Sequence, residues 1–283
     1  MTAATDPDPT PIRSRAVVLA NAPCGGGRKL RLSLPDWPGS RPGQFLMIGA
    51  GAESAVWRSD PLLPRPMAVY RDDALPAGEI ELLYKVVGRG TALLAEAETG
   101  ASVGVVGPLG RGFAVDGVGS GSGQGEGVSL LVGGGTGIAS LYELARARAA
   151  AGRRTVVILG ARSEADLMAR DDFAALDVEL VCTTEDGSLG VAGLVTQPLA
   201  ERLAESGAAA DVVAVGPTPM MRACAALAAG HGVACHVSLE NPMACGFGVC
   251  LGCAAPLREG GFALVCRTGP VFDAGEIDWE GLP

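Results

Sequence analysis

Four cysteines near the C-terminal end constrain the fold and chemistry of this chain more than any other feature. Cys245, Cys250, Cys253 and Cys266 follow the spacing C-x4-C-x2-C-x12-C. The first three must converge from one tight loop, and the spacing is that of plant-type [2Fe–2S] proteins. Glycines interleaved with the cysteines let the backbone curl and turn its N–H groups toward the sulfur atoms. The pattern therefore predicts a [2Fe–2S] cluster ligated by these four residues.

Zinc is the alternative that the same cysteines leave open. Structural zinc sites usually combine two close pairs of ligands, such as C-x2-C with a second C-x2-C or with histidines. This chain has one such pair, Cys250 and Cys253, and its two histidines, His231 and His236, lie outside the loop. The spacing favours iron–sulfur over zinc, and unligated thiols are a third interpretation. Neither histidine has a motif around it, so we interpret both as structural.

Composition narrows the class of protein. The 283 residues are 48% hydrophobic, enough to bury a sizeable core. A net charge of −9 argues against nucleic-acid binding and against docking on an anionic membrane. No apolar run approaches the ~18 residues of a membrane span, so we expect no membrane insertion. Residues 1–12 lack the features of a secretory signal, and we expect a flexible tail on a cytoplasmic protein whose thiols stay reduced.

Short apolar segments separated by turn residues run through residues 13–116. Many short strands at this spacing predict an antiparallel β-barrel. The expected strands are 16–19, 29–34, 45–48, 67–70, 80–87 and 102–106, with a short helix at 90–98. Residues 117–127 are mostly Gly, Ser, Gln and Glu, which predicts a linker or loop.

Strands alternate with helices through residues 128–238. This alternation predicts an α/β domain with a doubly wound parallel sheet. The expected strands are 129–132, 155–159, 178–183, 212–215 and 234–238. The expected helices are one from the loop at 133–137 to Ala150, then 164–175, 194–204 and 219–229. Residues 239–283 are expected to form a small C-terminal cluster module.

Two strand ends in the α/β half carry residues suited to a dinucleotide. A Gly-Gly-Gly-Thr-Gly turn after the first strand frees N–H groups for a pyrophosphate, although Ile138 breaks the strict G-x-G-x-x-G pattern. A Gly-Pro pair follows another strand at the same sheet edge, where ligands of such sheets bind. Plain turn chemistry is the alternative. The predicted NAD-binding residues are Gly133, Gly134, Gly135, Thr136, Gly137, Gly216 and Pro217.

In the barrel half, Arg65 lies on an expected strand. A planar guanidinium suits a phosphate because it can donate two charge-assisted hydrogen bonds. A surface arginine on an edge strand is the alternative. By themselves Tyr84 and Lys85 indicate only a strand, and Gly90 and Thr91 a turn that could begin a helix near a second phosphate.

Together these motifs resemble the electron-transfer subunits of dihydroorotate dehydrogenase B, a family in the ferredoxin-reductase-like superfamily. The resemblance runs over residues 13–280. It is carried by RPMAVY (65–70), LLYKVVGRGTALL (82–94), VGPLGRGF (106–113), LLVGGGTGIASLYELA (130–145), TEDGSLG (184–190), VGPTPMM (215–221), ENPMACGFGVCLGCA (240–254) and VCRTGPVFDAGEIDW (265–279). The cysteine block with CRTGPVFDA is highly specific, whereas the central motifs are shared among flavin reductases.

The resemblance implies FAD on the barrel, one [2Fe–2S] cluster on the four cysteines, and NADH on the α/β domain. It implies electron transfer from NADH through FAD and the cluster to FMN in a separate catalytic subunit, which interconverts dihydroorotate and orotate. The family assembles as a heterotetramer of two such pairs. No side chain is expected to be catalytic, since the cofactors carry the chemistry. The FAD-binding residues that the resemblance implies are Arg65, Pro66, Met67, Ala68, Tyr84, Lys85, Val86, Gly90 and Thr91.

Two positions bear on this interpretation. The family usually has Ser where this chain has Ala68, so a hydroxyl near the flavin is absent. Small subunits of NADH–ferredoxin transhydrogenases usually have Asp where this chain has Cys245, which favours the dihydroorotate family. Another NAD(P)H-dependent flavin and iron–sulfur reductase subunit, such as a ferredoxin reductase, is the alternative function.

Overall fold

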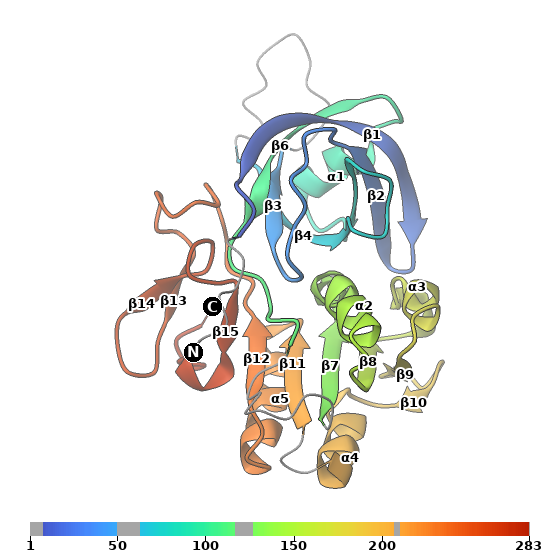
Figure 1. The fold of residues 1–283 in the computed structure, drawn as a ribbon, viewed down its shortest axis with the longest axis vertical. Helices are drawn as coiled ribbons and strands as arrows, with labels where there is room; N and C mark the ends of the chain where they lie inside the picture. The colour runs from blue at the N-terminus through green and yellow to red at the C-terminus, as the bar shows by residue number, and fades with distance from the viewer. Residues whose placement is uncertain (1–7, 50–62, 117–126, 207–209, 283) are drawn as a thin grey trace.

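The computed structural model describes residues 8–49, 63–116, 127–206 and 210–282 (Figure 1). Residues 1–7 of the expected tail lie outside the described residues, and so does the expected linker apart from residue 127. Figure 1 shows a barrel at the top, an α/β layer below it, and a C-terminal segment alongside both.

Six antiparallel strands close into a barrel, which confirms the expected architecture. Alternate side chains point inward, as strand geometry requires, and Leu30, Leu32, Ile80 and Leu82 are fully buried inside. A short helix, α1 (Arg89–Ala95), follows the fifth strand. In barrel order the strands are β1 (Ile12–Cys24), β2 (Gly27–Ser33), β5 (Glu79–Tyr84), β4 (Arg65–Arg71), β3 (Phe45–Ile48) and β6 (Ser102–Leu109).

The second layer is a seven-stranded sheet with helices on both faces, so the doubly wound α/β prediction is also confirmed. All its strands are parallel except the last, which runs antiparallel to its neighbour. The strand order is β10 (Val191–Ala192), β9 (Glu179–Thr184), β8 (Thr155–Ala161), β7 (Val128–Gly134), β11 (Ala210–Val215), β12 (Cys235–Ser238) and β15 (Val271–Asp273). Chain order reverses between β7 and β11, the point where such sheets bind ligands.

Alternating side chains of the central strands supply two separate cores. On one face Leu130 and Val132 pack with α4 (Thr196–Ser206) and α5 (Thr218–Gly230). On the other face Leu131 packs with α2 (Tyr142–Ala150) and α3 (Arg170–Ala174), and this core includes Tyr70 of the barrel. The barrel therefore sits on the α2 face of the sheet, over the reversal point (Figure 1).

The single helix expected at 164–175 is wrong. The chain instead forms a 3₁₀ turn at Glu164–Asp166, a non-helical break at Leu167 and Met168, and then α3. A side chain at Gly25 would lie 2.3 Å from the Leu167 carbonyl oxygen, and one at Gly27 would lie 2.5 Å from the Met168 methyl. The hairpin between β1 and β2 therefore packs directly against this pair, and that contact breaks the helix.

Other boundaries also differ from the sequence-based expectation, and two of them affect the site. The first part of the helix expected after the glycine loop is the 3₁₀ helix η1 (Gly135–Leu141), and α-helical geometry begins at Tyr142. The strand expected to reach Val87 ends at Tyr84, and Val87 is 85% exposed. Because β5 ends at Tyr84, the chain can turn there toward α1.

The C-terminal segment contributes a small sheet of β13 (Ala254–Pro256) and β14 (Phe262–Leu264). Strand β15 then adds to the edge of the α/β sheet beside β12, so the cysteine-containing segment is anchored to that layer at both of its ends.

Charged side chains join the barrel to the α/β layer. The Tyr70 hydroxyl donates to Asp172 Oδ2 at 2.7 Å, and Lys29 forms an ion pair with the same carboxylate. The buried Arg148 pairs with Asp211 at 2.8 Å and donates to the carbonyl oxygens at 114 and 115, where the chain leaves the barrel. These contacts fix the two layers against each other.

Candidate functional site

The four cysteines form two pairs on one side of the molecule. The thiols of Cys245 and Cys250 are hydrogen-bonded to each other, and the Cys266 amide donates to Cys253 Sγ at 3.4 Å. Cys253 and Cys266 are buried, whereas Cys250 is exposed. Within the described ranges no three His, Cys, Asp or Glu side chains gather tightly enough to hold one metal ion. Four thiols in two pairs match the donor set of a [2Fe–2S] cluster, which is held by four thiolates.

Backbone geometry makes the loop receptive to negative charge. Gly246 and Gly248 have φ values of +84° and +87°, which glycine adopts without strain. Burial opposes ionisation of Cys245, but N–H groups from Cys250, Phe247 and Val249 outweigh it and lower its pKa to about 6. Thiolates are the ligands of iron–sulfur clusters, so the donor set and its surroundings fit that group.

The same loop packs onto the barrel. A side chain at Gly246 would lie 2.4 Å from Met47 Cγ on β3 and 3.1 Å from Leu109 on β6. Only glycine permits this close approach. The cysteine loop is therefore held against the barrel wall rather than standing free of it.

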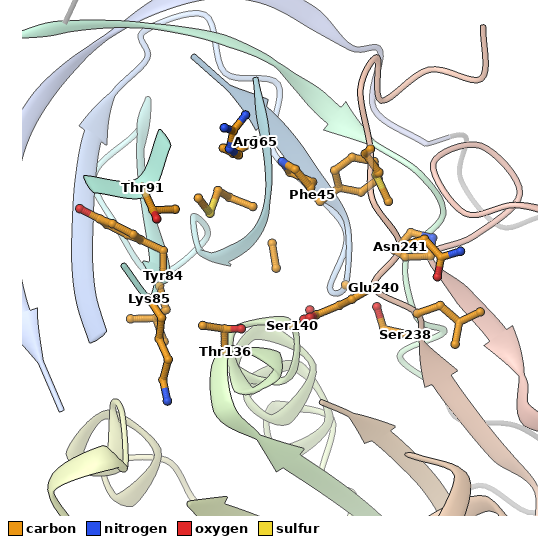
Figure 2. Close-up of a pocket in the computed structure, with 18 of the residues that line it drawn as sticks. Phe45, Arg65, Tyr84, Lys85, Thr91, Thr136, Ser140, Ser238, Glu240 and Asn241 are labelled. Atoms are coloured by element: carbon orange, nitrogen blue, oxygen red, sulfur yellow. The ribbon is translucent and has the colours of Figure 1, made fainter. Parts of the chain in front are cut away.

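A cavity of about 330 Å³ lies between the barrel, η1 and the start of the C-terminal segment (Figure 2). It brings together seven of the nine residues predicted to bind FAD, and Val86 and Gly90 do not line it. Gly90 lies directly behind it, since a side chain there would lie 2.6 Å from Arg65 Nε. The seven lining residues are Arg65, Pro66, Met67, Ala68, Tyr84, Lys85 and Thr91.

Three of these side chains differ in what they offer a ligand. Arg65 donates to the Leu63 carbonyl at 2.6 Å and keeps further N–H groups beside the cavity. Tyr84 presents its ring, because its hydroxyl donates to Asn21 at 2.9 Å away from the cavity. The Thr91 hydroxyl is used within its own turn, where it donates to Gly88 O at 3.0 Å.

Residues that were not predicted to bind FAD complete the cavity. Ala68 contributes only a methyl group, but Thr136, Ser140 and Ser238 bring hydroxyls from the α/β layer, as Figure 2 shows. The remaining polar groups are Glu240 and Asn241, which follow β12 and precede the cysteine block. Two sequence signals could have identified them: their position just after a parallel strand, and their place at the start of the ENPMACGFGVCLGCA motif.

A second cavity of about 660 Å³ lies at the carboxyl ends of β7, β8, β9 and β11. Of the predicted NAD-binding residues, Gly134, Gly135 and Pro217 line it. The others do not: Thr136 faces the first cavity, Gly137 packs against the backbone of Val215, and Gly133 packs against Ile138.

Gly216 also lies behind the lining, since a side chain there would lie 3.0 Å from the Gly134 carbonyl oxygen. The new residues at this cavity include Arg162 and Glu185. Lys85 and Val87 line both cavities, so the two cavities adjoin. No helix of the described ranges is both long and apolar enough to cross a membrane.

Two models of known families match parts of this chain. Residues 240–278 match the model of the iron-sulfur cluster binding domain of dihydroorotate dehydrogenase B. Residues 131–226 match the oxidoreductase NAD-binding domain. Among solved structures, the NADH-dependent reduced ferredoxin–NADP oxidoreductase has a chain with a TM-score of 0.78 and 32% identity, which covers 94% of this chain and 91% of that one. A ferredoxin reductase of carbazole 1,9a-dioxygenase, at 24% identity and TM-score 0.64, covers 79% of this chain and 67% of its own, and shares the fold.

Relatives of known name match over most of their length. The electron transfer subunit of dihydroorotate dehydrogenase B (NAD(+)) from Bacillus caldolyticus is 39% identical over 84% of this chain and 86% of its own. That of Geobacillus thermodenitrificans is 40% identical over 84% and 87%, and that of Fusobacterium nucleatum is 35% identical over 84% and 87%. With the cysteine pairs and the adjoining cavities, these matches show that the chain belongs to the family of dihydroorotate dehydrogenase B electron transfer subunits.

Proposed function

We propose that this chain oxidises NADH and passes the electrons through FAD and a [2Fe–2S] cluster to FMN in a dihydroorotate dehydrogenase catalytic subunit. The observation that carries this proposal is the series of three adjoining sites. The dinucleotide cavity and the barrel cavity share Lys85 and Val87, and the barrel cavity ends at Met243, two residues before the first cysteine.

The two cations of the barrel cavity are the residues we expect to hold FAD. Arg65 supplies a planar guanidinium for a phosphate, and Lys85 supplies a flexible ammonium group between the two cavities. Met67, Ala68 and the Tyr84 ring offer an apolar wall for a flat ring system. When bound, the flavin would accept a hydride and release single electrons, chemistry that no side chain of this chain can supply.

The NADH assignment rests on the second cavity. Gly134 and Gly135 end β7 without side chains, so a pyrophosphate can approach the backbone closely. With the nicotinamide end toward Lys85, the adenosine end lies toward Arg162 and Glu185 at β8 and β9. The Glu185 carboxylate suits a free ribose hydroxyl, as in NADH, whereas the Arg162 guanidinium suits a phosphate, and the NAD(+) in the names of the relatives favours NADH.

A docking surface for the catalytic subunit surrounds the cysteine loop. Four large apolar side chains are exposed there: Phe247 (55%), Val249 (75%), Leu251 (63%) and Phe262 (73%). Contiguous exposed apolar side chains mark interfaces, and a short path from the cluster to the partner requires one here. The relatives are named as subunits, and we propose the heterotetramer of two pairs for this chain as well. Eight free cysteines fit a reducing compartment, and on that ground we propose the cytoplasm.

Reconstitution tests this function. The purified chain should contain flavin, iron and sulfide, and with the catalytic subunit it should couple NADH to dihydroorotate and orotate. Val249→Asp should abolish this coupling while NADH still reduces ferricyanide, because the charge disrupts the docking surface alone. Val17→Asp is the matched control, since Val17 is 42% exposed on the barrel and away from the loop. A chain that holds both cofactors but couples only to ferredoxin would refute the proposal in favour of a ferredoxin reductase.

A further inference from the structure

Glu240 is the one carboxylate among the described residues that line the barrel cavity. It follows β12 and reaches toward Ser140 and Thr136 (Figure 2). No described residue gives it a hydrogen bond or an ion pair, in contrast to Asp211 and Asp172 elsewhere. Glu240 is an exposed residue at the rim of this cavity, and the protein around its carboxyl raises its pKa. Its carboxylate oxygens are therefore available to accept a hydrogen bond or a proton from a ligand in the cavity.

The proposed electron route leaves a proton to be removed. A hydride carries two electrons and one proton, whereas an iron–sulfur cluster accepts electrons only, one at a time. Each turnover therefore leaves one proton on the flavin that must reach solvent. The route needs a base beside the flavin.

The other groups that face this cavity cannot serve as that base. From the barrel, Arg65 and Lys85 present only hydrogen-bond donors to the cavity. The Tyr84 hydroxyl donates to Asn21, and burial raises its pKa further. The η1 and β12 sides present only hydroxyls there, and hydroxyls hold their protons at neutral pH. The carboxylate is the remaining base.

We propose that Glu240 accepts the proton released when the reduced flavin gives up its electrons. This inference rests on the proposed function. NADH transfers a hydride to flavin N5 and leaves as NAD⁺. The cluster takes the two electrons in turn and passes them to the partner subunit, while the N5–H bond breaks and its proton forms an O–H bond on the Glu240 carboxyl. The carboxyl then releases the proton to solvent, and reverse flow uses the same group as the acid.

The test separates hydride entry from proton exit in the complete complex. Glu240→Gln should retain flavin, and NADH should bleach it at the wild-type rate because no proton leaves in that step. Reoxidation of the flavin through the cluster should slow by about 100-fold or more, the usual contribution of a general base, with a solvent isotope effect. Glu259→Gln is the matched control: it removes the same charge from another exposed position in the same segment, one that does not line the cavity. Equal reoxidation rates in Glu240→Gln and wild type would overturn the inference.

A second measurement needs no variant. The midpoint potential of the bound flavin, measured against pH, should change slope where Glu240 ionises, above the ordinary glutamate range. A single slope across that range would overturn the inference even if Glu240→Gln failed to fold. A wild-type chain without flavin or iron would refute the proposed function itself, so the two failures are distinguishable.

Discussion

Substituting Gly90 tests the role of Arg65 without touching Arg65. A methyl group at Gly90 would lie 2.6 to 2.7 Å from the guanidinium nitrogens of Arg65, which is too close. The guanidinium is the far end of a flexible side chain, so it can move away at little cost to the fold. Gly90→Ala is therefore expected to displace the proposed phosphate ligand while leaving the barrel intact.

Two effects of opposite sign follow. Loss of a hydrogen bond between charged groups costs about 1.5–3 kcal/mol, which weakens FAD binding about 10- to 100-fold. Gly90 lies within α1, where alanine is favoured over glycine by about 0.5–1 kcal/mol. The variant should thus bind FAD more weakly and yet unfold at the same or a higher temperature.

Flavin titration of the protein without cofactor, followed by fluorescence quenching, measures the first effect, and thermal unfolding measures the second. Gly230→Ala is the matched control, because Gly230 is also helical and has nothing within 4 Å of an added methyl. Arg65→Ala should itself reduce the flavin retained through gel filtration. In that background Gly90→Ala should have no further effect on FAD affinity. An unchanged FAD affinity in Gly90→Ala, or additive effects in the double variant, would refute the reasoning.

Three further outcomes are expected. Cys250→Ser should lose iron and sulfide but keep FAD. NADH should then still bleach the flavin, while electron transfer to the partner subunit stops. Full electron transfer in this variant would contradict the ligand assignment. Asp211→Ala leaves the buried Arg148 without its carboxylate and should lower the free energy of unfolding, measured in urea, by about 3–5 kcal/mol. Glu179→Ala removes an exposed ion pair and should lower it by under about 1 kcal/mol. Equal losses in the two variants would count against the buried pair. Because burial raises the pKa of Glu240, the folded state without flavin holds this proton more tightly than the unfolded state. Its stability should fall as pH rises above the ordinary glutamate pKa, and thermal melts of Glu240→Gln should lack that part of the decline.

The cysteine site could be predicted from the sequence because its chemistry is local. Three of the four ligands lie in one loop from Cys245 to Cys253, so their spacing alone restricts the geometry. The short strands of the first half and the strand–helix alternation of the second half are local patterns in the same sense. The barrel and the α/β sheet that they predict are both confirmed.

The helix expected at 164–175 shows where local signals fail. Its residues favour helix, but Leu167 and Met168 pack against the hairpin at Gly25 and Gly27, which lies more than 130 residues earlier in the chain. No local pattern records such a contact. The glycine loop shows the same limit, since Thr136 turns toward one cavity while Gly134 and Gly135 line the other.

The sequence by itself determined which groups are present: four thiols at cluster spacing, a phosphate-binding cation on a strand, and glycines at two strand ends. Tertiary structure alone decided which of them meet. Glu240, Arg65 and Ser140 come from three distant segments and share one cavity only because the barrel sits over the reversal point of the sheet. Spacing along a chain restricts neighbours within a loop, whereas contacts between distant segments depend on how whole layers pack.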